Sequence, residues 1–489
     1  MSVSFGKAAY AKVIQRLIER IYHQSPLQDS IYEQAINWFD EKDLRDQKAT
    51  ELEQQLFLFE NRQQQCKKGD QAAVARNLKQ AEEQHKTFSE EIEEARFQRY
   101  SELQSLCRDI LSLCQGENFV DTNNASAKML GTIQLICPTR RRHIARENQK
   151  ARHLYKAVLS IRLLDRLLMD GLIDHPFILE RYEAGKSVPY SDETEYHPYR
   201  DDIQIPVLMA AILQDIGRCH PICQGILKGA DGSFDEFREL EAEERNTFLQ
   251  TSYTETLNYV QDALTVGRYT GRSKEERDRF VQGEIEKREL IQLLLKQAVR
   301  PQDVLGSILR IPQIYTGMVL STRSSYNYED LPKAALALEK SAELGKLSKN
   351  SVAAFLRIVG MFPQGYGITY IPKDSDGNDM ERYEYAIVTG LYPPDFRTPI
   401  CRMVTYSLTY QASARGCIVS AENNLYFAQG RKKLEVVSEE RLLDILRKLV
   451  YNFEERMASP LLPRCWHPDD YFLNQKNQNL WNKAVVSQN

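Results

Sequence analysis

A long stretch without helix-breaking residues is the feature that most constrains this fold. Between Glu41 and Gln115 the sequence has no proline and only one glycine, Gly69. Lysines just before this glycine and an aspartate just after it are typical of one helix ending and another beginning. The stretch therefore predicts two long helices joined in a hairpin that turns at Gly69.

A heptad pattern of apolar residues follows the predicted turn. Its members alternate spacings of four and three: Val74, Leu78, Ala81, His85, Phe88, Ile92 and Ala95. Such a stripe is typical of the packing seam of a coiled coil, and we interpret His85 as a packing residue of that seam. Two interpretations are open at this point. The helical arm binds another protein or a second copy of the chain, or it forms an intramolecular hairpin that packs on the next domain.

The remainder of the chain predicts a mainly α protein with a small β-module. Its 489 residues suggest two to four domains. We expect an N-terminal helical or coiled-coil region over residues 1–120, an all-α domain over 121–365, a β-rich module over 366–430, and a C-terminal helix and tail over 431–489. Abundant Tyr, Thr, Val and Ile between turn signals mark the β-rich module.

Charge and cysteine content exclude several classes of protein. The chain has 64 Lys and Arg against 68 Asp and Glu, which argues against a nucleic-acid binder, because phosphate neutralisation needs excess positive charge. The nine cysteines contain no CxxC pair, which argues against zinc-ribbon and thioredoxin folds. No apolar run approaches the ~20 residues that cross a bilayer, and the N-terminus lacks the apolar core of a signal peptide. We therefore expect a cytoplasmic protein without membrane insertion.

Four short stretches carry a resemblance to a known family. They are Ala210 to Gly217 (AAILQDIG), Gly225 to Gly229 (GILKG), Ile308 to Tyr326 (ILRIPQIY, then STRSSY) and Phe355 to Gly365 (FLRIVGMFPQG). In this order they resemble the HD-GYP subfamily of HD-domain phosphohydrolases. The resemblance implies a helical core followed by a small β extension. Active members of that subfamily hydrolyse the bacterial second messenger cyclic di-GMP, using a metal cluster that activates water and clamps the phosphoryl oxygens.

Few of the metal ligands of that family are present here. Asp215 matches the aspartate of the HD pair, but Gln214 stands where the histidine would be. His153 corresponds to an upstream ligand histidine, and Gln313 stands at a late ligand aspartate. No histidine occurs from Pro221 to Trp466, where the other ligands would fall. We therefore expect no resident cofactor, whereas an active protein would need a di-iron or di-manganese centre.

Three basic residues are candidates for binding a phosphate group. Lys228 matches the lysine that faces the substrate phosphate in the HD-GYP family. Arg142 and Arg146 are one helical turn apart and suit a bidentate grip on phosphate. Their RxxxR spacing also resembles half of the cyclic di-GMP motif of PilZ domains, and the companion motif is absent. The alternative is a solvated helix face or a strip of salt bridges.

A second candidate metal site follows the degenerate HD motif. Cys219, His220 and Cys223 lie close together in the sequence, and two thiolates with an imidazole would begin a zinc site. No fourth ligand is evident, so we interpret them as packing residues at a helix end.

These patterns predict a non-catalytic, HD-GYP-like bacterial signalling or scaffold protein. We expect it to bind other signalling proteins through its helical arm, with a homodimer as one form. One alternative is a metal-dependent cyclic di-GMP phosphodiesterase with an atypical site. The other is an effector that binds cyclic di-GMP without cleaving it, through Lys228 and the face of Arg142 and Arg146.

Overall fold

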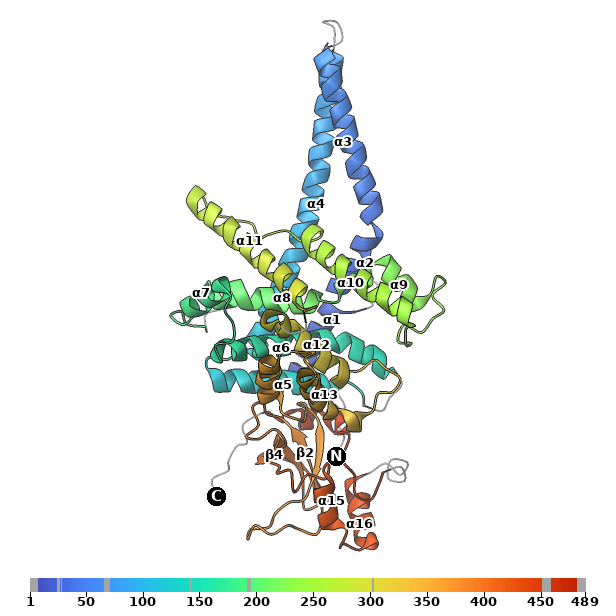
Figure 1. Ribbon diagram of the computed structural model, residues 1–489, viewed down its shortest axis with the longest axis vertical. Coiled ribbons are helices and arrows are strands. Elements are labelled where there is room, and N and C mark those ends of the chain that lie inside the picture. Colours follow the sequence, from blue (N-terminus) through green and yellow to red (C-terminus); the bar gives the residue numbers. More distant parts are fainter. Residues whose placement is uncertain are drawn as a thin grey trace. The chain divides into compact units, whose positions relative to one another are not determined.

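The computed structural model describes residues 8–23, 27, 29–65, 71–139, 143–190, 195–300, 303–450 and 459–481. It is mainly helical with a small antiparallel sheet in the C-terminal part (Figure 1), which confirms the predicted fold class. Contacts divide the chain into two compact units. The first unit consists of the described residues in three segments: Met1–Ile21, Cys107–Ile212 and Leu293–Asn489. The second unit consists of the described residues in two segments: Tyr22–Leu106 and Leu213–Gln292. The units cut across the predicted regions 1–120 and 121–365, because helices from both regions pack into each unit.

The second unit is built from helices. They are α2 (Ile31–Asp40), α3 (Lys42–Gln65), most of α4 (Gln71–Cys114), the 3-10 helix η2 (Ile216–Cys219), α9 (Pro221–Lys228), α10 (Ala242–Asp262) and most of α11 (Lys274–Gln297). A capping box opens α2, because Ser30 Oγ accepts from Glu33 N at 3.3 Å and Glu33 Oε2 accepts from Ser30 N at 3.1 Å. The helix η2 packs against α10 and α2.

Helices α3 and α4 form the predicted hairpin, here called the helical arm (residues 42–65 and 71–106). The two helices run side by side in Figure 1, and Lys48 Nζ lies 4.5 Å from the centroid of the Phe88 ring. Leu78 and Ala81 of the heptad stripe are buried, whereas Ala95 at its end is exposed. Part of the stripe is therefore buried within the hairpin, and the choice between partner binding and an intramolecular role stays a prediction. The turn at Gly69 lies outside the described residues.

A central helix, α6 (Ile144–Met169), organises the first unit. Its side chains between Ala151 and Leu164 are buried on nearly every side, because α12, α14 and α1 pack around it. The helices of this unit are α1 (Ala9–Ile21), α5 (Phe119–Ile136), α6, α7 (Pro176–Gly185), the π-helix η1 (Arg200–Gln204), α8 (Ile205–Leu213), α12 (Val304–Val319), η3 (Tyr328–Asp330), α13 (Lys333–Glu343) and α14 (Lys349–Val359).

The apolar helix α8 (Ile205–Leu213) has an unusual start. A π-helical turn precedes it, in which Ile205 N donates to Arg200 O, five residues back. Pro206 then has no N–H with which to make the bond of an α-helix to residue 202. The α-helical part ends at Leu213, and Asp215 caps the short helix η2.

The β-module is a four-stranded antiparallel meander. Its strands are β1 (Gly367–Tyr370), β2 (Glu384–Val388), β3 (Ile400–Tyr406) and β4 (Thr409–Ile418), paired in the order β1-β2-β3-β4. Ser407 and Leu408 join β3 to β4 in the left-handed region, with φ of 50° and 59°. The buried Glu384 carboxylate accepts a hydrogen bond from Leu408 N at 3.0 Å and so stabilises this turn.

The predicted C-terminal helix and tail complete the core of the β-module. The helical segments are α15 (Ala428–Leu434), α16 (Glu439–Leu449), α18 (Asp469–Leu473) and η4 (Gln475–Gln478). Trp466 from the tail stacks on Tyr385 with ring centroids 4.7 Å apart, and its indole N–H donates to Ala386 O at 2.8 Å. The tail is therefore part of the folded unit.

Two features bear on the environment of the protein. Across the described ranges, no helix has both the length and the apolar character needed to cross a bilayer. The cysteines within these ranges form no disulfide with one another.

Candidate functional site

The residues expected from the family resemblance are distributed over both units. His153 lies on α6 in the first unit, fully buried, with its Nε2 3.4 Å from Gln149 Nε2. Gln214, Asp215 and Lys228 belong to the second unit. Within the described residues, no group of three or more His, Cys, Asp or Glu side chains could hold a metal ion. Among the described residues, therefore, no such group forms around His153 or Asp215.

Of the remaining predicted residues that the structure describes, Lys228 and Arg146 lie near helix ends, and Gln313 is half-buried in the middle of α12. Lys228 ends α9, and its carbonyl oxygen accepts a hydrogen bond from Phe234 N at 2.9 Å. Arg146 is exposed in the first turn of α6, while Arg142 lies outside the described residues. Gln313 on α12 accepts a hydrogen bond from Arg310 Nη1 at 3.3 Å.

Packing accounts for the Cys219, His220 and Cys223 group. The Cys219 thiol donates to Tyr32 O at 3.7 Å, and the Cys223 thiol donates to Phe248 O at 3.8 Å. Burial raises the pKa of each of these two thiols to about 12, which keeps them protonated at pH 7. His220 Nδ1 accepts from Ile222 N at 3.3 Å and thereby caps α9.

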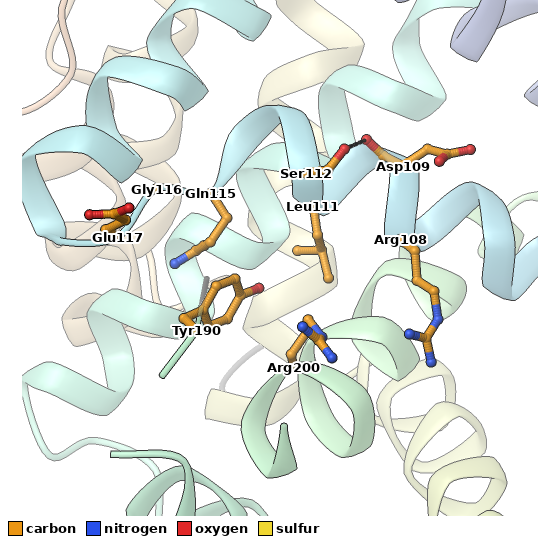
Figure 2. A pocket seen from close by; sticks show the side chains of 9 residues that line it. All are labelled: Arg108, Asp109, Leu111, Ser112, Gln115, Gly116, Glu117, Tyr190 and Arg200. Atoms are coloured by element: carbon orange, nitrogen blue, oxygen red, sulfur yellow. Dashed lines mark hydrogen bonds between the residues drawn. The ribbon is translucent and has the colours of Figure 1, made fainter. Parts of the chain in front are cut away.

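A cavity in the first unit brings together polar residues that no sequence motif marked. Its volume is about 290 Å³ (Figure 2). The C-terminal end of α4, the following loop and two later residues line it: Arg108, Asp109, Leu111, Ser112, Gln115, Gly116, Glu117, Tyr190 and Arg200. In Figure 2, Leu111, Gln115, Tyr190 and Arg200 point toward one another across it.

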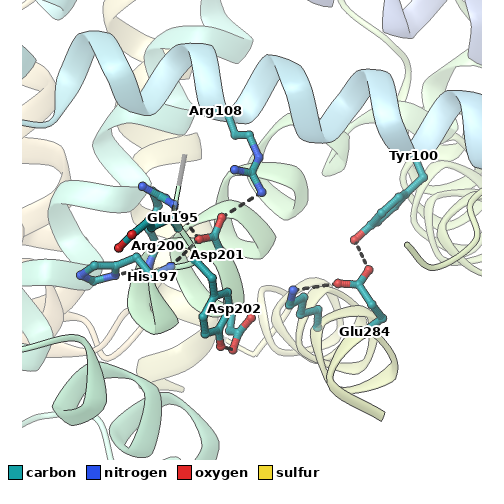
Figure 3. A network of polar contacts seen from close by, with 10 residues as sticks. Tyr100, Arg108, Glu195, His197, Arg200, Asp201, Asp202 and Glu284 are labelled. Carbon is teal, nitrogen blue, oxygen red and sulfur yellow. Dashed lines mark hydrogen bonds and ion pairs between the residues drawn. The ribbon is translucent and has the colours of Figure 1, made fainter. Parts of the chain in front are cut away.

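One carboxylate joins the two arginines of this cavity. Asp201 pairs with Arg108 Nη2 at 3.0 Å through Oδ1 and with Arg200 Nη2 at 2.9 Å through Oδ2 (Figure 3). The backbone N–H of His197 also donates to Asp201 Oδ2, at 2.8 Å. Asp201 and Arg200 are almost fully buried, whereas the Arg108 side chain is 44% exposed. Arg108 is thus the accessible cation of this group.

His197 contributes an acceptor to the same group. Burial and the positive charge of Arg200 lower the pKa of His197, so its ring is neutral at pH 7. Nδ1 of the neutral ring accepts a hydrogen bond from Arg200 N at 3.1 Å. The imidazole therefore orients the backbone of the π-helix and needs no proton to do so.

A third arginine lies directly behind the cavity wall. Arg162 on α6 is 2% exposed, and its Nη2 contacts Gln115 Oε1 at 2.7 Å and Asp165 Oδ2 at 2.9 Å. Its Nε and Nη1 atoms are buried and have no hydrogen-bond partner within the described residues. Burial disfavours the guanidinium charge, but Asp165 together with Cys114, Tyr199 and Tyr190 outweighs this effect and raises the pKa of Arg162 above its usual value. Arg162 therefore stays charged beside the cavity.

The π-helix explains why sequence analysis missed this site. Arg200, Asp201 and Asp202 are three consecutive charged residues, and the wide π-turn buries all of them. A charged run immediately before an all-apolar helix was the available signal.

Another buried charge holds the second unit together. Glu284 on α11 accepts from Tyr100 Oη, Gly267 N and Lys287 Nζ, each at 2.7 Å. Figure 3 shows Tyr100 pointing from α4 onto this carboxylate. The contacts tie α4, α11 and the loop before α11 into one packing unit, which is a structural role.

Comparison with known proteins adds no family to these observations, since no protein-family model, curated protein or solved structure matches the chain.

Proposed function

We propose that the protein is a non-catalytic, HD-GYP-like signalling or scaffold protein of the bacterial cytoplasm. The observation that carries the proposal is the replacement of ligands within the four resembling stretches, where Gln214 and Gln313 stand for a histidine and an aspartate. An amide is a weak ligand for a transition metal compared with imidazole or carboxylate. The buried position of His153 within the packed α6 also fits a core role.

Metal content tests the absence of catalysis. We expect purified protein to hold iron and manganese well below one equivalent and to leave cyclic di-GMP intact. Stoichiometric metal that is lost in Asp215→Ala, but kept in the exposed-site control Asp46→Ala, would contradict the proposal and support the phosphodiesterase alternative. Calorimetric binding of cyclic di-GMP that is lost in Lys228→Ala would support the effector alternative instead.

The helical arm is the part through which we propose partner binding. Its heptad stripe is used inside the hairpin, yet α3 also carries large apolar side chains on its surface: Leu44 is 70% exposed, Phe57 66% and Leu58 46%. Exposed Phe and Leu side chains next to each other are typical of protein contact sites. A homodimer through these residues is one form of this proposal.

Substitution of the exposed pair tests the role of the arm. Phe57→Ser with Leu58→Ser should leave the thermal unfolding temperature unchanged, because both side chains are solvated, but should reduce the oligomeric mass or the recovery of one defined partner. Val436→Ser is the matched control, since Val436 is 83% exposed outside the arm. If the unsubstituted protein, the double variant and the Val436→Ser control had equal mass by light scattering and equal partner recovery, the arm would not be the binding site.

A further inference from the structure

The cavity of the first unit has the dimensions of a small-molecule site. Its volume of about 290 Å³ is close to the ~300 Å³ at which ligand pockets begin. Ligand sites combine an enclosed surface with a few convergent polar groups. Here the groups that face the cavity are the guanidinium groups of Arg108 and Arg200 and the amide of Gln115, whereas the Ser112 hydroxyl donates to Asp109 O at 2.9 Å.

The electrostatics of the cavity favour an anion. Arg108 uses Nη2 for its pair with Asp201, and its other donors have no partner within the described residues. Arg162, whose charge is balanced by Asp165, lies behind Gln115, and two of its nitrogen atoms lack hydrogen-bond partners among the described residues. An unsatisfied buried guanidinium is costly, and an anion nearby offsets that cost across the low-dielectric interior.

The two acidic residues of the lining do not cancel this preference. Asp109 is already paired with Arg20. Glu117 is exposed, and Figure 2 places it at the opposite end of the lining from Arg108. The arginine end of the cavity is therefore the positive end, and Glu117 weakens anion binding only from a distance.

We propose that this cavity binds a small molecule that carries a carboxylate or phosphate group, with the anionic group at Arg108 and the body of the molecule between Gln115 and Tyr190. Planar bidentate donors of an arginine match both of these oxyanions. The proposal concerns the first unit alone and holds whether or not the protein is HD-GYP-like.

Titration calorimetry of the full chain tests the proposal with two probes, inorganic phosphate and benzoate. We expect at least one probe to bind at a single site, and Arg108→Gln to weaken that binding about tenfold or more. Arg441→Gln is the matched control: Arg441 is 43% exposed, pairs with Asp444 and lies outside the cavity lining. This control should change affinity by less than about twofold. Binding of phosphate alone would assign a phosphate-bearing ligand, and binding of benzoate alone a carboxylate.

Two further variants separate the cavity from general charge effects. Ser112→Phe fills the cavity from an exposed helix position without changing charge, and it should abolish binding. Glu117→Gln removes the only lining acid without an ion pair among the described residues, and it should strengthen binding about two- to threefold. No heat from either probe at about 10 mM would overturn the proposal. Equal weakening by Arg108→Gln and Arg441→Gln, or full binding by Ser112→Phe, would also overturn it.

Discussion

At the scale of single residues, buried charges in this protein are held by several partners each. The Glu284 side chain is 3% exposed. Burial alone raises the pKa of this carboxyl, but the charge of Lys287 and hydrogen bonds from Lys287, Tyr100 and Gly267 outweigh burial and hold the pKa below its usual value. The ionised form therefore stabilises the folded second unit, because the unfolded chain binds a proton more readily at this group.

This shift predicts how the stability contribution of Glu284 depends on pH. Because the folded pKa is lowered, the contribution is fully present above the ordinary Glu value of 4.5 and is lost as pH falls through the folded value. Glu284→Gln should lower the free energy of unfolding by about 1–3 kcal/mol at pH 7 and by less as the solution is acidified below that value. Urea unfolding at pH 7 and at acid pH measures this difference, with the exposed Glu289→Gln as control. An equal loss at both pH values would show that the charge of Glu284 is not responsible.

At the scale of elements, one glycine of the HD-like motif has a clear packing role. Gly217 lies in η2 against α10, where its N–H donates to Thr256 Oγ1 at 3.0 Å. A Cβ atom on Gly217 would lie 2.0 Å from Ser252 O and 2.6 Å from Thr256 N. Both of these atoms belong to a helix backbone, which cannot easily move aside. The glycine is therefore explained by close approach of two helices, without any catalytic role.

A pair of alanine substitutions tests this explanation. Gly217→Ala should destabilise the protein by about 1–3 kcal/mol, because η2 and α10 would have to separate. Gly225→Ala, inside α9 with no atom within 4 Å of the added Cβ, should instead stabilise it by about 0.5–1 kcal/mol. Thermal unfolding of both variants measures the contrast, and a stable Gly217→Ala protein would refute the close approach.

Sequence patterns predicted elements well where the signal was local. The heptad stripe from Val74 to Ile92 predicted the arm, because its spacing follows directly from helix geometry. The start of α8 has no such local signal, because the π-turn before Pro206 depends on burial of Arg200 and Asp201. The spacing of apolar residues along the sequence carries no information about the burial of charged residues.

At the scale of the whole molecule, the tail is the clearest case of long-range packing. Trp466 belongs to the core of the β-module, where it contacts Tyr385 and Ala386. Cys465 pairs with Ile368 in an isolated antiparallel bridge beside β1. The tail thus covers an edge of the sheet that would otherwise present unpaired backbone groups.

Removal of the Trp466 ring should be one of the most damaging single changes in the first unit. Trp466→Ala should cost about 3–5 kcal/mol, since it leaves a cavity in the core and removes the indole hydrogen bond to Ala386 O. Leu473→Ala, at a residue of the same tail that is 39% exposed, should cost less than about 1 kcal/mol. Thermal unfolding compares the two, and similar losses would mean that the tail contributes little to the core.

The sequence by itself determined the mainly α class, the helical arm and the C-terminal β-module, because helix and strand periodicities are properties of neighbouring residues. Only the tertiary structure decided that Arg108, Gln115, Tyr190 and Arg200 surround one cavity, with Arg162 behind it. These residues come from α4, α6 and the segment around η1, which are separated along the chain. These residues come together because buried helices pack against one another and because a π-turn places Arg200 and Asp201 as an ion pair in the core. Neither cause produces a repeating pattern in the sequence.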